Sequence, residues 1–359
     1  MSEDQCRAMG RTVAGFVQSL DRPPHGEPVM ERYVAIDNVC AWPNLTRLPS
    51  GDIIATIFNQ PCHGLWEGDV ECWASTDGVS WELRGVPAPH EDGKNRMNVA
   101  AGLGPDGALI VIASGWSDRP PVGQPAPHAQ ARCLEPWVCR SSDGGRTWAR
   151  SADVEAPPDG SQVFVPFGDI VDISQGKLAV SFYGGEIGRR VTSSAWCYSC
   201  DDGGTTWGRP TTIAANTLTE TTLLSLDPAH LLAAARTTED QHTRIYRSDD
   251  AGQTWDDQGP VTTMNQHPAH LLRIADGRIL LVYGIRNTSQ HGVGARLSDD
   301  EGKTWDNPRI LVDLDNPHVD CGYPASAQLD DGTIVTAYYA AATPAHQRYH
   351  MGVVRWNAD

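Results

Sequence analysis

The sequence predicts an all-β protein, a six-bladed β-propeller, from three observations. A short box that ends in Trp occurs five times, six apolar hairpins are distributed among the boxes, and the repeat unit has room for four strands. Repeats of this length are typical of stacked supersecondary units. With 359 residues, of which 40% are hydrophobic, the chain is long enough to bury the core of such an architecture.

The five boxes each predict a tight turn. In such a turn the Asp and Ser side chains accept backbone N–H groups, Gly supplies a positive φ, and Trp packs beneath. Five copies of one turn need no reaction to explain them, so we assign the box aspartates a structural role. The boxes span Ser75 to Trp81, Ser141 to Trp148, Cys200 to Trp207, Ser248 to Trp255 and Ser298 to Trp305, with aspartates Asp77, Asp143, Asp202, Asp250 and Asp300.

The six hairpins count the blades and set the domain boundaries. Their near-continuous apolar flanks indicate strands that are buried on both faces. The sixth unit has no box, and we expect its outer strands from ERYVAI (31–36) and HMGVVRWNA (350–358), which would close the ring. Residues 1–29 are then an N-terminal tail and residues 30–359 the propeller. The predicted turns centre on Gly51, Gly107, Gly176, His230, Gly277 and Gly332.

Charge and composition exclude several functions. A net charge of −17 argues against nucleic-acid binding, which needs clustered Lys and Arg. No apolar run has membrane-spanning length, and the first residues do not resemble a secretory signal. Nine scattered cysteines favour a reducing cytoplasm over a disulfide scaffold. Cys197 and Cys200 lie three apart on a predicted strand and so on opposite faces, and we expect neither a metal site nor a cofactor.

The topology predicts which face of the propeller carries chemistry. The hairpin between strands 1 and 2 of a blade and the box between strands 3 and 4 lie at one end of the blade. The opposite end presents the first residues of each strand 1 and the last residues of each strand 2. Seven candidates lie at this end: Trp42, Asn98, Glu220, His267 and Tyr323 at strand starts, and Arg236 and Arg286 at strand ends. Glu220, Arg236, Arg286 and Tyr323 are ionisable groups that converge on one axis, a typical feature of a binding or catalytic site.

Together the boxes and these residues resemble the sialidase (neuraminidase) superfamily over roughly residues 30–359. The resemblance implies a tyrosine nucleophile, a glutamate that serves it, three arginines that bind the substrate carboxylate, and an aspartate acid/base. Tyr323 in CGYPASAQLDDGTI matches the nucleophile and Glu220 in TETTLLSL its glutamate. Arg236 in LLAAAR matches one arginine, and Arg286 in YGIR resembles another more loosely.

Two positions depart from the superfamily pattern. Ala41 in CAWPNL stands where the first arginine is expected, and His63 in NQPCHGLWEGD stands near the place of the acid/base aspartate. We therefore expect an exo-acting, sialidase-like glycoside hydrolase on an acidic sugar. Its expected catalytic residues are Tyr323, Glu220 and His63, and its expected substrate-binding residues are Arg236, Arg286, Trp42, Asn98 and His267.

Two other functions use the same residues. In a polysaccharide lyase, arginines neutralise a uronic acid, and Tyr323 with His63 carries out β-elimination. In a glycan-binding propeller without turnover, Trp42, Trp66 and Trp116 would be platforms for sugar rings. Reducing sugar released without an unsaturated chromophore would distinguish hydrolysis from elimination.

Overall fold

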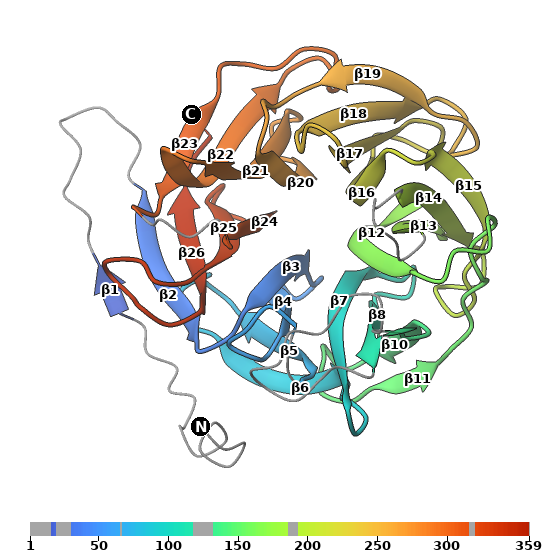
Figure 1. Ribbon diagram of the computed structural model, residues 1–359, viewed down its shortest axis with the longest axis horizontal. Coiled ribbons are helices and arrows are strands. Elements are labelled where there is room, and N and C mark those ends of the chain that lie inside the picture. Colours follow the sequence, from blue (N-terminus) through green and yellow to red (C-terminus); the bar gives the residue numbers. More distant parts are fainter. Residues whose placement is uncertain are drawn as a thin grey trace.

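The computed structural model describes residues 16–18, 30–64, 67–117, 132–185, 193–315 and 320–358. Every regular element in these ranges is a β-strand, and Figure 1 shows the strands as blades around a central axis. The molecule is a β-propeller, as the repeats predicted. None of the described residues forms a helix with the length and hydrophobicity needed to cross a membrane.

Three blades are separate four-stranded antiparallel sheets that run outward from the axis in chain order. The first contains β3 (Ala41–Arg47), β4 (Ile53–Phe58), β5 (Val70–Ser75) and β6 (Glu82–Ala88). The fourth contains β16 (Leu218–Ser225), β17 (Leu231–Thr237), β18 (Thr243–Ser248) and β19 (Asp256–Pro260). The fifth contains β20 (Gln266–Arg273), β21 (Ile279–Asn287), β22 (Gln290–Ser298) and β23 (Arg309–Asp313).

The second and third blades form a single nine-stranded sheet, which corrects the prediction of six separate blades. One half contains β7 (Lys94–Leu103), β8 (Leu109–Ser117), β9 (Arg132–Cys133), β10 (Trp137–Ser141) and β11 (Ala149–Ser151). The other contains β12 (Val165–Ser174), β13 (Lys177–Gly185), β14 (Ser193–Cys200) and β15 (Gly208–Ala214). The inner strands β7 and β12 pair in parallel, with Gly102 opposite Ile170. A Cβ at Gly102 would lie 2.3 Å from the Ile170 carbonyl oxygen, so glycine permits this approach.

The last sheet closes the ring with strands from both ends of the described chain. It contains β24 (Gly322–Gln328), β25 (Ile334–Ala340), β26 (His350–Trp356), β2 (Glu31–Asp37) and β1 (Phe16–Gln18). Pairing of β2 with β26 confirms the predicted outer strands of the sixth unit. The pairing of β1 with β2 attaches three residues of the predicted tail to this sheet, and the rest of residues 1–29 lie outside the described residues. Six four-stranded units are thus distributed over five sheets.

The five boxes lie at one end of the blades, which we call the box face. In the first box the Asp77 carboxylate accepts the Val79 and Ser80 N–H groups at 2.8 and 3.0 Å. In the third box Cys200 replaces the usual serine, and its Sγ accepts the Gly204 N–H at 2.9 Å. Cys200 of the CxxC pair therefore ends β14 and belongs to the third box turn.

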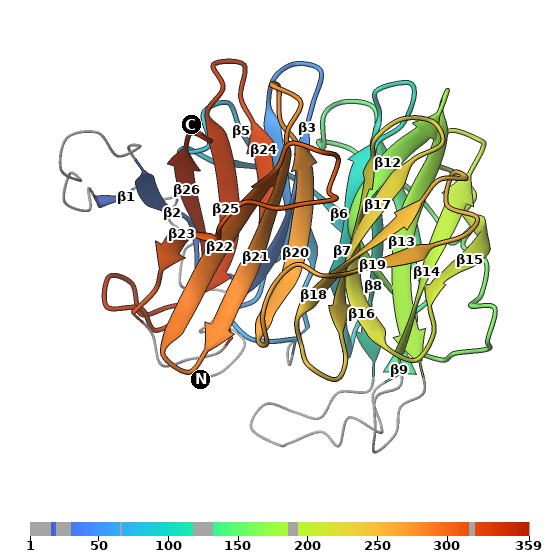
Figure 2. The ribbon, with the colours of Figure 1, turned by 90° about the horizontal axis from the view of Figure 1, so that it is seen from above.

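The opposite end, the site face, presents the starts of the inner strands β3, β7, β12, β16, β20 and β24 (Figure 2). Below it, polar side chains cross the axis between inner strands of different blades. Asn44 Nδ2 donates to Asp169 Oδ1 at 3.0 Å, and His270 Nε2 lies 3.0 Å from Asp169 Oδ2. These contacts connect β3, β12 and β20, so the blades that carry the site are joined directly beneath it.

Candidate active site

A chain of hydrogen bonds connects Tyr323, Glu220 and Arg236 on the site face. The Tyr323 hydroxyl donates to Glu220 Oε1, and Arg236 Nη1 donates to Glu220 Oε1 and Oε2 at 3.1 and 3.3 Å. Tyr323 is the second residue of β24, whereas Glu220 and Arg236 face each other on the β16–β17 hairpin. The side chain of Glu220 is 8% exposed and that of Arg236 is 20% exposed. The structure therefore brings together the three residues that the sequence predicted.

The environment keeps Glu220 ionised and Tyr323 neutral. Burial on its own would raise the pKa of Glu220, but the charge of Arg236 and the hydrogen bond from Tyr323 outweigh burial and lower this pKa to about 2. Burial and the neighbouring Glu220 carboxylate raise the pKa of the Tyr323 phenol above its ordinary value. The pair is thus a carboxylate acceptor beside a phenol donor, the arrangement that general-base assistance to a nucleophile requires.

Arg286 supplies a second guanidinium beside Tyr323. Its Cζ lies 5.1 Å from the centroid of the Tyr323 ring. Its Nε and Nη2 donate to the Cys321 carbonyl at 3.0 and 2.7 Å, and Nη2 lies 3.3 Å from the Tyr339 hydroxyl. Within the described part of the chain, no hydrogen bond engages Nη1 of Arg286 or Nη2 of Arg236. Each guanidinium therefore keeps donors for an anionic ligand.

His63 is held by an aspartate that the sequence analysis missed. His63 Nδ1 lies 2.9 Å from Asp320 Oδ1, and the Tyr349 hydroxyl donates to Asp320 Oδ2 at 2.5 Å. The Tyr339 hydroxyl donates to the same carboxylate. Burial opposes ionisation of Asp320, but the hydrogen bonds and charge of its partners outweigh burial and hold its pKa below the ordinary value. The His63 side chain is 53% exposed.

Trp42 connects the two halves of the site. Its ring centroid lies 4.8 Å from that of His63 and 6.3 Å from that of Tyr323, both in edge-on contacts. Phe167 contacts Tyr323 from another side at 6.0 Å. Trp42 thus sets the spacing between the nucleophile candidate and the imidazole. The role of Trp42 in stacking against a sugar ring stays a prediction. In the structure its own ring packs against the neighbouring rings of His63 and Tyr323.

A family match decides how the chain is classified. The model of the BNR repeat-like domain matches residues 51–336, which is most of the chain. The chain belongs to the BNR repeat-like domain family. Among curated proteins no sequence matches the chain.

Several solved structures share the fold of this chain. A protein of unknown function from Dyadobacter fermentans DSM 18053 has a TM-score of 0.74 at 22% identity and covers 88% of this chain and 94% of its own. The Hadza microbial sialidase Hz136 has a TM-score of 0.66 at 18% identity, covering 89% and 65%. The Trypanosoma rangeli sialidase in complex with DANA has a TM-score of 0.65 at 15% identity, covering 90% and 56%. The predicted resemblance to the sialidase superfamily is confirmed for the fold, and this chain spans about two thirds or less of the two sialidases.

Ala41 stays the clearest departure of this BNR repeat-like protein from the sialidase pattern. It is fully buried and lies opposite Phe58 across β3 and β4. Alanine therefore stands where the sialidase pattern has an arginine, and the guanidinium charges that act on Tyr323 are those of Arg236 and Arg286.

The other predicted substrate-binding residues lie on the site face and are buried to different degrees. His267 is 1% exposed, and burial followed by the charges of Arg236 and Arg286 lowers its pKa to about 3. Asn98 lies opposite Ser114, and its buried Nδ2 has no hydrogen-bond partner among the described residues. Trp116 is half-buried against the core of the first and last blades. These roles stay predictions, and Trp66 lies outside the described residues.

Proposed function

We propose that the protein is a glycoside hydrolase of the sialidase type. In this proposal it removes a carboxylated sugar from the end of a glycan, with Tyr323 as the nucleophile. The observation that carries the proposal is the hydrogen-bond chain from Tyr323 through Glu220 to Arg236. Sialidases are exceptions among glycosidases in using a tyrosine for this step.

In the first step Tyr323 Oη attacks the anomeric carbon while its proton passes to Glu220. The anomeric C–O bond to the leaving group breaks, and His63 gives a proton to the departing oxygen. In the resting site this transfer is uphill, because the pKa of Glu220 is about 2 and that of Tyr323 is raised. The proton therefore moves only as the new C–O bond forms. Water then attacks the anomeric carbon of this tyrosyl glycoside and breaks its bond to Tyr323 Oη. His63 takes a proton from that water, and Glu220 returns its proton to the departing Tyr323 oxygen.

A carboxylated sugar suits this nucleophile electrostatically. A carboxylate nucleophile that approached a substrate carboxylate to 4 Å would meet repulsion of about 4 kcal/mol at an effective dielectric of 20, and a neutral phenol avoids this repulsion. The unengaged donors of Arg236 and Arg286 attract the substrate carboxylate. Losing the third arginine weakens that attraction by about ten- to a hundredfold. We therefore propose the broad class of carboxylated sugars.

A lyase is a second candidate, which the His63–Asp320 pair favours. A histidine held by an aspartate is suited to removing a proton as well as to donating one. In this reaction His63 would take the proton next to a uronic acid carboxylate that Arg286 neutralises. The leaving oxygen would take a proton from Tyr323, leaving an unsaturated sugar. No bond from Tyr323 to carbon would form.

One experiment separates these functions. The protein is incubated with sialosides, other glycosides of 2-keto-3-deoxy sugar acids and uronic-acid polymers, while reducing ends and ultraviolet absorbance are followed together. Hydrolysis gives reducing ends alone, and elimination adds the chromophore. The intact-protein mass after quenching tests for a sugar adduct. Tyr323→Phe is the variant, and Tyr338→Phe, a tyrosine on β25, is the matched control. Turnover without any adduct in a quenched sample, and undiminished in Tyr323→Phe, contradicts the nucleophile.

A further inference from the structure

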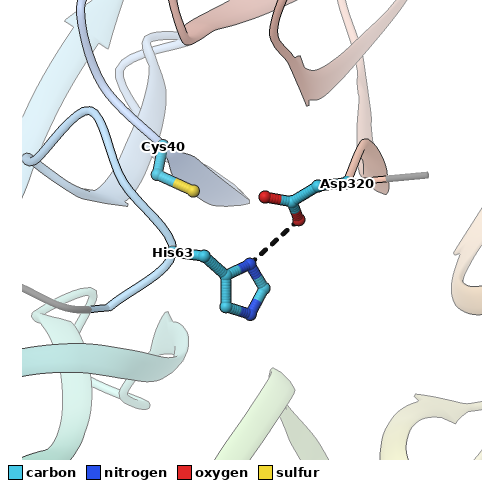
Figure 3. A group of neighbouring side chains, drawn as sticks. All are labelled: Cys40, His63 and Asp320. Carbon is cyan, nitrogen blue, oxygen red and sulfur yellow. Dashed lines mark hydrogen bonds and ion pairs between the residues drawn. The ribbon is translucent and has the colours of Figure 1, made fainter. Parts of the chain in front are cut away.

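Cys40 is a buried thiol beside the His63–Asp320 pair that the proposed reaction does not use. One ligand atom from each of Cys40, His63 and Asp320 lies within 4.8 Å of the others. Figure 3 shows the three side chains converging from separate segments. Cys40 follows β2, His63 lies between β4 and β5, and Asp320 precedes β24, so the group forms where the ring of blades closes.

The donor set of this cluster is typical of zinc. Zinc sites combine thiolate, imidazole and carboxylate, with ligand atoms about 3.3 to 3.8 Å apart in a tetrahedron. The 2.9 Å separation of His63 Nδ1 and Asp320 Oδ1 has to widen slightly, and the thiol has to approach. Magnesium and calcium prefer oxygen ligands alone, so the sulfur selects against them.

Surrounding groups support metal binding as well. Hydroxyls of Tyr339 and Tyr349 donate to the Asp320 carboxylate and hold its orientation. Hydrogen-bonded neighbours of this kind fix the ligands of metal sites. Cys40 is fully buried, whereas the side chain of His63 is 53% exposed, so the cluster is open on the side of the imidazole. Three protein ligands leave a fourth position for water.

We propose that Cys40, His63 and Asp320 bind a zinc-class divalent cation that reversibly inhibits the enzyme. A cation bound to His63 Nδ1 and Asp320 separates the two groups, and the imidazole then keeps only its Nε2 proton and cannot donate it to a leaving group. The Tyr323–Glu220 pair stays intact. The inhibition rests on the proposed function, whereas the binding of the metal does not.

Cobalt(II) tests the binding without any substrate. Protein stripped with a chelator is titrated with Co²⁺, and one equivalent is expected to produce the ultraviolet thiolate-to-cobalt band. Cys40→Ser and His63→Ala are both expected to abolish tight cobalt binding. Because His63 is exposed, its variant tests the site even if the change at buried Cys40 prevents folding. Cys139→Ser, another buried thiol located on β10, is the matched control and keeps the band. Absence of the band in wild type, or its persistence in both ligand variants, overturns the site.

Zinc tests the consequence of binding. Because the metal connects three segments at the ring closure, we expect a Tm rise of about 5 °C or more in wild type and none in Cys40→Ser. Zinc is expected to slow hydrolysis of an alkyl glycoside by about 100-fold and that of a nitrophenyl glycoside less than about twofold, because the second leaving group needs no acid. Equal inhibition of both substrates overturns the proposed inhibition. If no glycoside is hydrolysed, the proposed function fails, while the cobalt and Tm results still decide the metal site.

Discussion

The two faces of this propeller use the same kinds of side chain in opposite ways. On the box face each aspartate accepts hydrogen bonds from its own turn, as Asp143 does from Arg146 and Thr147. On the site face carboxylates find partners far along the chain: Glu220 with Tyr323, and Asp320 with His63. The box carboxylates are satisfied before the blades assemble. In the site, Glu220 shares a hairpin with Arg236, but it meets Tyr323 only when distant blades come together, and Asp320 meets His63 in the same way.

This difference separates residues that hold the fold from residues that await a ligand. In a box turn the carboxylate is already engaged by groups of its own turn, as Asp300 is by the N–H and hydroxyl of Thr304. The site face collects two guanidiniums, a phenol and an imidazole around two buried or half-buried carboxylates. Changes on the site face should therefore affect catalysis first, and changes on the box face should affect stability first.

The largest effect is expected at Tyr323. Tyr323→Phe keeps the ring contacts with Trp42 and Phe167 but removes the proposed nucleophilic oxygen. The kcat should therefore fall by at least about 10⁴-fold while Tm stays within a few degrees. Glu220→Gln should impair the same step. Single-turnover kinetics and thermal unfolding of both variants measure this.

The double variant provides the control. The proposed reaction makes Tyr323 and Glu220 act as one unit, so Tyr323→Phe with Glu220→Gln should be scarcely slower than the worse single variant. Multiplicative losses would show that the two side chains act separately, and the hydrogen bond between them would then have no catalytic role.

Sequence predicted the fold closely because its signals are local. All six hairpin turns lie where apolar flanks and turn residues placed them, including the turn at His230, which has no glycine. The merging of the second and third blades escaped prediction, since it depends on Gly102 meeting Ile170 of another blade. No local pattern encodes that approach.

Site residues were predictable where they follow the repeat. Glu220 and Arg236 start and end one hairpin, and Tyr323 starts the equivalent strand of another blade. Asp320 lies in a loop outside the repeat, and its partner His63 belongs to the first blade. Only the folded ring brings them together. For Asp320, the position three residues before Tyr323 was the one signal available in the sequence.

Arg286 should show a smaller, ligand-dependent effect. Arg286→Lys keeps the charge but loses the planar arrangement of donors, so binding of a carboxylated sugar should weaken by about ten- to a hundredfold. Binding of the matching neutral sugar should change far less. Inhibitor titration with acid and amide forms of one sugar measures the difference.

Arg296 on the same blade is the matched control. Its guanidinium donates to the carbonyl oxygens of Val261, Trp305 and Asp306 instead of facing the site. Arg296→Lys should lower stability without favouring either sugar. Equal losses for acid and neutral sugars in Arg286→Lys would assign Arg286 the same structural role.

The site face should also make folding sensitive to mild acid. The pKa of His267 is lowered to about 3 in the folded protein, first by burial and then by Arg236 and Arg286, so the unfolded chain binds its proton first as pH falls below about 6.5. Stability that this group contributes is present above pH 6.5 and is lost as pH falls toward 3. Glu220, with a folded pKa of about 2, adds a loss in the same direction only below about pH 4.5.

His267→Asn tests that slope. Urea unfolding at several pH values between 6.5 and 4.5 should show a dependence shallower by up to one proton, about 1.4 kcal/mol per pH unit. His350, whose folded pKa is lowered to about 4, stays in both proteins and contributes equally. If the pH dependence of the unfolding free energy is the same in His267→Asn, the acid sensitivity does not come from His267.

The smallest effect is expected on the box face. Asp77→Ala removes the acceptor for the Val79 and Ser80 N–H groups, and water replaces it because the turn is exposed, so unfolding free energy should fall by about 1 kcal/mol. The turn also retains the bond from Trp81 Nε1 to the Gly78 carbonyl at 3.2 Å. Because Asp77 lies at the far end of its blade from Trp42 and His63, kcat/KM should stay within about twofold. Urea unfolding and steady-state kinetics on one preparation measure both quantities, with Asp250→Ala as a second box variant. If either variant stays folded yet loses activity more than about tenfold, the box turns position the site through the blade, and the two faces do not act independently.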